Sequence, residues 1–167
     1  MKKNYFNFSN VNALVTGSSG NLGSEISMCL AEHGANVFLN GRNKKKILEL
    51  NQAITEKGYK SQPAIFDVTN QTQVKKFFLK NKSIGIIINN AYEGKTGNFN
   101  TFSSLNYQKA FQSNILSTAN IINESKKSLI NSLKKNGFAS IINVSSIYGS
   151  LSPDPNIYEN TKLDNPP

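Results

Sequence analysis

VTGSSGNLGSEI, residues 15–26, is the stretch that decides how this chain folds. It joins a short apolar run to a segment of helical period and carries Gly17, Gly20 and Gly23. Gly17 permits a sharp turn, Gly20 lets a phosphate approach the backbone, and Gly23 lets a helix pack close to a sheet. The amide groups and the dipole at the start of that helix favour an anionic pyrophosphate. The alternative is a glycine-rich turn without a ligand.

Strand-like and helix-like segments alternate along the rest of the chain. Short apolar runs predict strands, and apolar residues at helical spacing predict the helices between them. The expected strands are 11–17, 35–41, 60–68, 84–91 and 138–146, and the expected helices are 21–34, 42–58, 70–82 and about 104–135. This alternation predicts an α/β fold, a Rossmann-like doubly wound parallel sheet of about five strands with helices on both faces. Residues 1–149 would form this domain, and 150–167, which are proline-rich and lack a period, an irregular active-site loop or tail.

The composition is that of an ordinary globular domain, with 38% hydrophobic and 17% charged residues. No apolar run is long enough to span a bilayer and the N-terminus lacks the apolar core of a signal peptide, so we expect a cytoplasmic protein without a membrane partner. The net charge is +9, but the lysines are spread over different expected helices, which favours solvated faces over a nucleic-acid site. The single cysteine, Cys29, excludes an internal disulfide framework and is expected in the core. No cluster of cysteine and histidine indicates a metal.

The end of the second expected strand bears on which dinucleotide would bind. The stretch LNGRN, 39–43, contains no carboxylate that could accept hydrogen bonds from the ribose of NAD. Arg42 can instead form charge-assisted hydrogen bonds to a 2′-phosphate. The sequence therefore favours NADP over NAD. The alternative is that Arg42 only begins a helix in solvent.

Five motifs, TGSSGNLG, FDVT, INNA, SNILSTAN and IINVSSIYG, follow one another in an order that resembles the short-chain dehydrogenase/reductase family. The resemblance runs from about Phe6 to Gly149. It implies a Rossmann-fold enzyme that moves a hydride between NAD(P) and a carbonyl or alcohol of a small-molecule substrate. With Arg42 added, the expected dinucleotide-binding residues are Gly17, Ser19, Gly20, Asn21, Leu22, Gly23, Arg42, Asp67, Val68, Asn89, Asn90 and Ala91.

The same resemblance assigns roles within this set and beyond it. Asp67 and Val68 would flank the adenine, and the NNA motif (89–91) would support the sheet and the cofactor ribose. Asn114 would be the catalytic asparagine within a helix, which holds a proton-relay water, and Ser146 the catalytic serine. The alternatives are a solvated helix residue for Asn114 and a turn-forming hydroxyl for Ser146.

Two departures from the usual family pattern stand out. Position 21 is Asn, which makes the glycine motif T-G-x-x-G-x-x-G, as in the extended branch that modifies nucleotide sugars. Tyr92 follows N-N-A where glycine is usual. N-N-A-Y together with S-S-I-Y-G and a Pro-Asp loop resembles a bacterial subgroup linked to nonulosonic (sialic-like) sugar biosynthesis.

Tyr158 and Lys162 have the Y-x-x-x-K spacing of the family's catalytic pair. A tyrosine that donates its proton at neutral pH needs its pKa lowered by about three units from its usual ~10, and a lysine one helical turn away can do this. That geometry needs a helix through the pair. Asn160 and Thr161 are weak helix formers, and Pro166 and Pro167 forbid its continuation, so a helix here would last two turns at best, too short to be stable alone. We therefore expect this pair to be a decoy, with the true tyrosine and lysine past Pro167.

If the pair is a decoy, the chain is a C-terminally truncated and inactive form of such a reductase, and the C-terminal part of the fold is missing. The fifth strand, 138–146, would then be an exposed sheet edge, and homo-oligomers would form only in a full-length protein. The alternative function is a non-catalytic dinucleotide-binding module or a degenerate paralogue.

Overall fold

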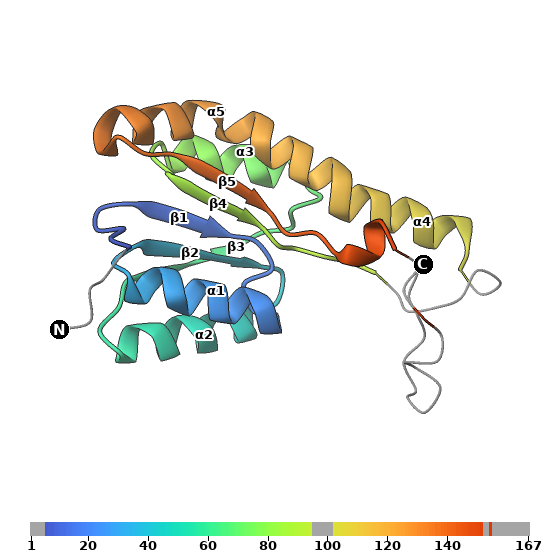
Figure 1. Ribbon diagram of the computed structural model, residues 1–167, viewed down its shortest axis with the longest axis horizontal. Helices are drawn as coiled ribbons and strands as arrows, with labels where there is room; N and C mark the ends of the chain where they lie inside the picture. The colour runs from blue at the N-terminus through green and yellow to red at the C-terminus, as the bar shows by residue number, and fades with distance from the viewer. Residues whose placement is uncertain (1–5, 95–101, 152–153, 155–167) are drawn as a thin grey trace.

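The computed structural model describes residues 6–94, 102–151 and 154. Its five strands form one parallel sheet in the order β3-β2-β1-β4-β5 (Figure 1). The strands are β1 (Asn12–Val15), β2 (Asn36–Gly41), β3 (Ser61–Ile65), β4 (Ile86–Asn89) and β5 (Ser140–Asn143). The predicted Rossmann-like, doubly wound sheet is confirmed, with each strand inside its expected range.

Helices cover both faces of this sheet. The helices are α1 (Asn21–Glu32), α2 (Lys44–Glu56), α3 (Gln71–Lys80), α4 (Ser104–Phe111) and α5 (Ser117–Asn136). Figure 1 shows α1 and α2 on one side of the sheet and α3 and α5 on the other. None of the helices in the described part of the chain is long and apolar enough to cross a membrane.

Alternate residues of each central strand belong to two separate hydrophobic clusters. Val15 packs in the cluster with α1 and α2, whereas its neighbour Leu14 packs in the cluster with α3 and α5. Ile88 and Ile87 of β4 divide in the same way. Burial on both faces explains why these strands read as continuous apolar runs. Each fully buried aliphatic side chain contributes ~1.5–3 kcal/mol, so the two clusters account for much of the stability of the sheet.

The buried face of α1 consists of the small residues Gly23, Ser27 and Ala31, which let the helix lie close to the sheet. The expected core position of Cys29 is wrong, because it lies on the opposite side of a helix with about 3.6 residues per turn and is exposed. The side chain of Leu22 is also turned to solvent and is 53% exposed.

We expected helices to bury both faces of every strand, and this expectation is wrong for β5. Ile141 and Ile142 are 37% and 49% exposed. In the described residues β5 pairs only with β4, so it is an edge strand, as expected. Among the described helices α5 packs against it.

The expected continuous helix at about 104–135 contains an irregular turn. A π-helical segment, Gln112–Leu116, joins α4 to α5, and α5 ends at Gly137, whose φ of 71° is left-handed. Beyond β5, Ile147–Gly149 form a short 3₁₀ turn. A π turn inside an α-helix is often found at a functional site, and this one contains Asn114.

Candidate functional site

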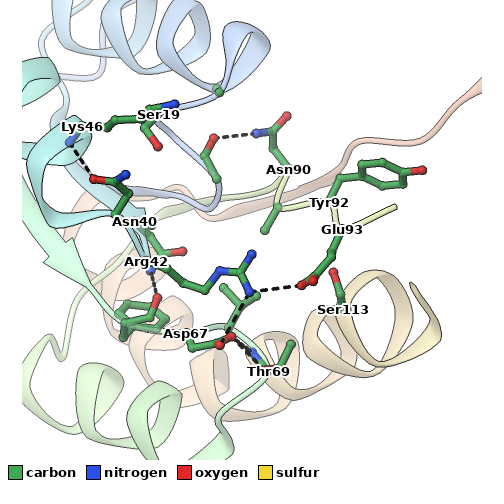
Figure 2. Close-up of a pocket in the computed structure, with 18 of the residues that line it drawn as sticks. Ser19, Asn40, Arg42, Lys46, Asp67, Thr69, Asn90, Tyr92, Glu93 and Ser113 are labelled. Atoms are coloured by element: carbon green, nitrogen blue, oxygen red, sulfur yellow. Dashed lines mark hydrogen bonds and ion pairs between the residues drawn. The ribbon is translucent and has the colours of Figure 1, made fainter. Parts of the chain in front are cut away.

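A cavity of about 470 Å³ lies where β1, β2, β3 and β4 end (Figure 2). Its floor is the topological switch point of the sheet, because β1 lies between β2 and β4 and the chain crosses from one side to the other there. Ligands of open α/β sheets bind in this crevice, outside the carboxyl ends of the strands. The volume falls within the roughly 300–1,000 Å³ of small-molecule sites.

The cavity brings together all but one of the residues expected to contact a dinucleotide. The expected residues that line it are Gly17, Ser19, Gly20, Asn21, Leu22, Gly23, Arg42, Asp67, Val68, Asn90 and Ala91. Sequence reasoning missed Asn40, Gly41, Asn43, Lys46, Phe66, Thr69, Tyr92, Glu93 and Ser113, which also line it. Most of these follow the end of a strand, and that position was the signal that could have found them.

Close packing leaves no room for a side chain at Gly17 or Gly23. Gly17 has a φ of 62°, and a Cβ there would stand 2.9 Å from the Cα of Ala91. A Cβ on Gly23 would overlap the carbonyl oxygen of Gly17. A Cβ on Gly20 would meet only that same oxygen, at 3.4 Å. The surface at Gly20 is therefore open, as the approach of a phosphate to the backbone requires.

The start of α1 also differs from the starts of the neighbouring helices. Asn43, Asn70 and Ser103 each accept a hydrogen bond from a backbone amide in the first turn of α2, α3 and α4. Gly20, at the start of α1, offers no such side chain. The first amide groups of α1 thus face the cavity without a side-chain cap, and helix starts of this kind favour anions.

Thr16 and Asn90 fasten this turn to the end of β4. The hydroxyl of Thr16, which is buried, donates to the carbonyl of Ile88 and accepts from the amides of Asn90 and Ala91. The Asn90 carboxamide in turn donates to the carbonyls of Thr16 and Gly17, at 3.0 and 3.3 Å. These hydrogen bonds hold the Gly17 turn against the end of β4.

Asn89 is the expected contact residue that does not line the cavity. Its side chain is buried and donates to the Oδ1 of Asn143 in β5, at 2.8 Å. It joins two strands and does not face the cavity. Asn40, by contrast, lines the cavity from β2 and donates to the carbonyls of Ala64 and Phe66, so it fastens β2 to the exit of β3.

Arg42 crosses the cavity from the end of β2. Its Nη1 lies 3.1 Å from Oε2 of Glu93 and 4.0 Å from Oδ2 of Asp67, and Figure 2 shows the guanidinium between these two carboxylates. Asp67 is itself held, because its Oδ1 accepts from the amide and hydroxyl of Thr69. Lys46 is a second cation in the lining. The side chains of Arg42, Asp67 and Glu93 are 61%, 34% and 44% exposed, so these pairs contribute at most about 1 kcal/mol.

The short chain dehydrogenase family matches residues 11–162. The chain belongs to this family. Gluconate 5-dehydrogenase of Gluconobacter oxydans (strain 621H) is 41% identical over 69 residues, which are 41% of this chain and 27% of that protein. The 3-oxoacyl-[acyl-carrier-protein] reductase FabG of Chlamydia muridarum (strain MoPn / Nigg) is 30% identical over 142 residues, or 82% of this chain and 56% of that one.

Solved structures of other proteins share the fold of this short-chain dehydrogenase. A gluconate 5-dehydrogenase from Burkholderia cenocepacia J2315, in complex with NADP and tartrate, matches with a TM-score of 0.75 and 26% identity over 89% of this chain and 58% of that one. An actinorhodin polyketide ketoreductase (F189W) with NADPH matches with a TM-score of 0.76 and 19% identity, over 86% and 56%. The chain spans less than two thirds of each of these relatives.

Asn114, the catalytic asparagine that the family resemblance implied, holds the segment after β4. Its Oδ1 accepts from the amide of Glu93 at 3.1 Å and from the hydroxyl of Ser113 at 3.0 Å. Its Nδ2 donates to the Glu93 carbonyl at 3.5 Å. The residue is half-buried in the π turn, so it is not a solvated helix residue. A catalytic role for Asn114 stays a prediction.

Ser146, the other expected catalytic residue, is not brought into the cavity. Ser146 is exposed, does not line the cavity, and accepts from the amide of Tyr148 at 3.2 Å. It thus makes the turn-forming contact that was the alternative for it, and its catalytic role stays a prediction. Tyr158 and Lys162, the expected decoy pair, lie outside the described residues, as does nearly all of the expected tail.

Proposed function

We propose that this chain binds NADP in the cavity, as the dinucleotide-binding part of a short-chain dehydrogenase that acts on a carbonyl or alcohol. One observation carries this proposal. The open surface at Gly20 and the uncapped start of α1 stand at the switch point of the sheet, in the same cavity as the cation Arg42. The pyrophosphate of NADP therefore has a partner in the start of α1, and its 2′-phosphate has a partner in Arg42.

The pyrophosphate, the adenine and the 2′-phosphate each have candidate partners among the residues that line the cavity. The pyrophosphate would lie on the amides at the start of α1, beside Gly20. The adenine would lie beside Asp67 and Val68, and the 2′-phosphate of the adenosine ribose on Arg42, in a cavity that Lys46 also lines. When bound, the dinucleotide supplies or accepts a hydride at its nicotinamide ring. The hydrogen bonds from Asn90 to the carbonyls of Thr16 and Gly17 would fix the Gly17 turn and so help to orient the ribose.

The preference for NADP over NAD rests on charge. The end of β2 carries Arg42 and no carboxylate, and a 2′-phosphate can bind a guanidinium through two hydrogen bonds. The related gluconate 5-dehydrogenase from Burkholderia cenocepacia was solved with NADP, which supports this choice. The carboxylates of Asp67 and Glu93 would compete with the 2′-phosphate for the guanidinium of Arg42.

The substrate that we propose is a sugar-derived carbonyl or alcohol. The motif resemblance to a subgroup of nonulosonic sugar biosynthesis supports it, and so do the two relatives named as gluconate 5-dehydrogenases. Ser146 would hydrogen-bond the reacting oxygen and Asn114 would hold a relay water. We propose that Tyr158 does not donate the proton, because the prolines at 166 and 167 oppose the helix that this role needs.

A second candidate is a dinucleotide-binding module without catalysis. The position of Ser146 favours it, because this hydroxyl is exposed and engaged by the amide of Tyr148 outside the cavity. The two candidates share the cofactor and differ in turnover. Turnover in an assay of carbonyl reduction with NADPH as the reductant would therefore exclude the second candidate.

Titration with NADPH tests the cofactor proposal. Binding would raise the fluorescence of the dihydronicotinamide ring and release heat in calorimetry, and NADH would bind more weakly. A well-folded sample that takes up neither coenzyme at millimolar concentration would refute the proposal. Circular dichroism on the same sample shows whether the sheet and helices are formed.

A further inference from the structure

The ion pair between Arg42 and Glu93 links two separate edges of the cofactor cavity. Arg42 follows β2, and Glu93 follows β4, with β1 lying between these strands. The two side chains meet at 3.1 Å. Of the two carboxylates beside the guanidinium, Glu93 is the nearer, since Asp67 stands 4.0 Å away.

Glu93 is held in place by its backbone, which leaves its carboxylate to act on Arg42. Its amide donates to Asn114 Oδ1 and its carbonyl accepts from Asn114 Nδ2. Asn114 comes from the π turn between α4 and α5. The segment after β4 thus presents a negative charge to the residue expected to receive a 2′-phosphate, and it does so from a fixed position.

We propose that Glu93 sets how strongly this site prefers a 2′-phosphorylated nucleotide, by competing with the 2′-phosphate for Arg42. The proposal rests on the proposed function, and it adds a specificity-determining residue to it. A 2′-phosphate must take the guanidinium from Glu93 and also approach that carboxylate, whereas a 2′-hydroxyl does neither. Glu93 therefore weakens the binding of nucleotides that carry a 2′-phosphate and leaves the binding of nucleotides with a 2′-hydroxyl nearly unchanged.

The test uses nucleotides without a nicotinamide ring, so it is independent of turnover. The dissociation constants of adenosine 2′,5′-bisphosphate and adenosine 5′-monophosphate are measured by calorimetry, and their ratio gives the preference for the 2′-phosphate. Glu93→Gln keeps the shape of the side chain and the backbone bonds to Asn114. We expect this variant to increase the preference about two- to five-fold, the range that a solvent-exposed ion pair supports.

Two further variants make the result specific. Glu32→Gln removes the same charge from the far end of α1, where the residue is exposed, and should leave the ratio unchanged. Arg42→Gln should abolish most of the preference, and adding Glu93→Gln to it should then have little effect. If Glu93→Gln still raises the preference for the 2′-phosphate in the Arg42→Gln background, the effect is one of general charge, and the proposal is overturned.

The remaining outcomes separate this proposal from the proposed function. If the wild type binds both nucleotides and Glu93→Gln leaves their ratio unchanged or lowers it, Glu93 is not a competitor and only this inference is lost. If Glu93→Gln weakens both nucleotides, Glu93 is a direct ligand, which also overturns it. If the folded wild type binds neither nucleotide, the proposed function itself fails.

Discussion

Asn90 holds the turn at Gly17 by two hydrogen bonds from one carboxamide nitrogen, to the carbonyls of Thr16 and Gly17. The contact joins residues 74 and 73 positions apart in the chain. It fixes the glycine turn against the exit of β4, and the cofactor cavity lies directly above it. Its loss should therefore affect both stability and binding.

Asn90→Ala should lower the free energy of unfolding by ~1–3 kcal/mol, because the carbonyls of Thr16 and Gly17 each lose a donor, although that of Gly17 keeps the amide of Gly20. It should also weaken NADPH binding, since the turn is no longer fixed. Urea unfolding and NADPH titration measure the two effects. Asn131→Ala is the matched control, because exposed Asn131 donates to the carbonyl of Lys82 far from the cavity. Equal effects of the two variants on NADPH binding would contradict the role given to Asn90.

Gly23→Ala and Gly20→Ala should differ sharply in stability. The new methyl group at position 23 would overlap the carbonyl oxygen of Gly17, and overpacking of this kind costs ~1–3 kcal/mol. At position 20 the methyl group meets one atom at 3.4 Å, so the variant should stay within about 1 kcal/mol of the wild type. Denaturant unfolding of both variants checks this. A Gly20→Ala variant as unstable as Gly23→Ala would show that the turn is packed differently.

Arg42→Gln should weaken NADPH binding about ten- to a hundred-fold, which corresponds to the ~1.5–3 kcal/mol of a hydrogen bond to a charged group. NADH binding should change little, because a 2′-hydroxyl carries no charge. Lys44→Gln serves as the control: it removes a cation from the start of α2, where the residue does not line the cavity. Parallel loss of NADPH and NADH binding in Arg42→Gln would argue against a 2′-phosphate contact.

Tyr158→Phe should leave NADPH binding unchanged and should not lower the rate of carbonyl reduction. The reason is the pair of prolines after Lys162, which opposes the helix that would place this lysine beside the tyrosine. The decrease of NADPH absorbance with a panel of sugar-derived carbonyls gives the rate. Turnover by the wild type that disappears in Tyr158→Phe would make Tyr158 and Lys162 the catalytic pair.

The parallel sheet and the place of the cavity could be predicted from the sequence, because both follow from local patterns. Apolar runs alternate with helical periods, and the glycines after β1 stand where a parallel sheet binds its ligand. Arg42 could be placed at this edge for the same reason, because it directly follows β2. The place of Asp67 came from the family resemblance.

Side-chain partners could not be predicted, because they come from distant parts of the chain. The Arg42–Glu93 contact joins residues 51 positions apart. Nothing near Asn89 in the sequence indicates that it turns toward Asn143 in β5. The exposure of Cys29 has another cause: α1 packs through small residues, and a search for large apolar side chains misses such a face.

The sheet separates the interior into two compartments, since Leu14 and Val15 are consecutive yet belong to different clusters. Ile54 on α2 and Ile121 on α5 thus belong to different clusters on opposite faces of the sheet. Substitutions at such distant sites add in free energy. Each helical layer can therefore change its side chains over evolutionary time without a compensating change in the other, while the strand ends that carry the cavity keep their positions.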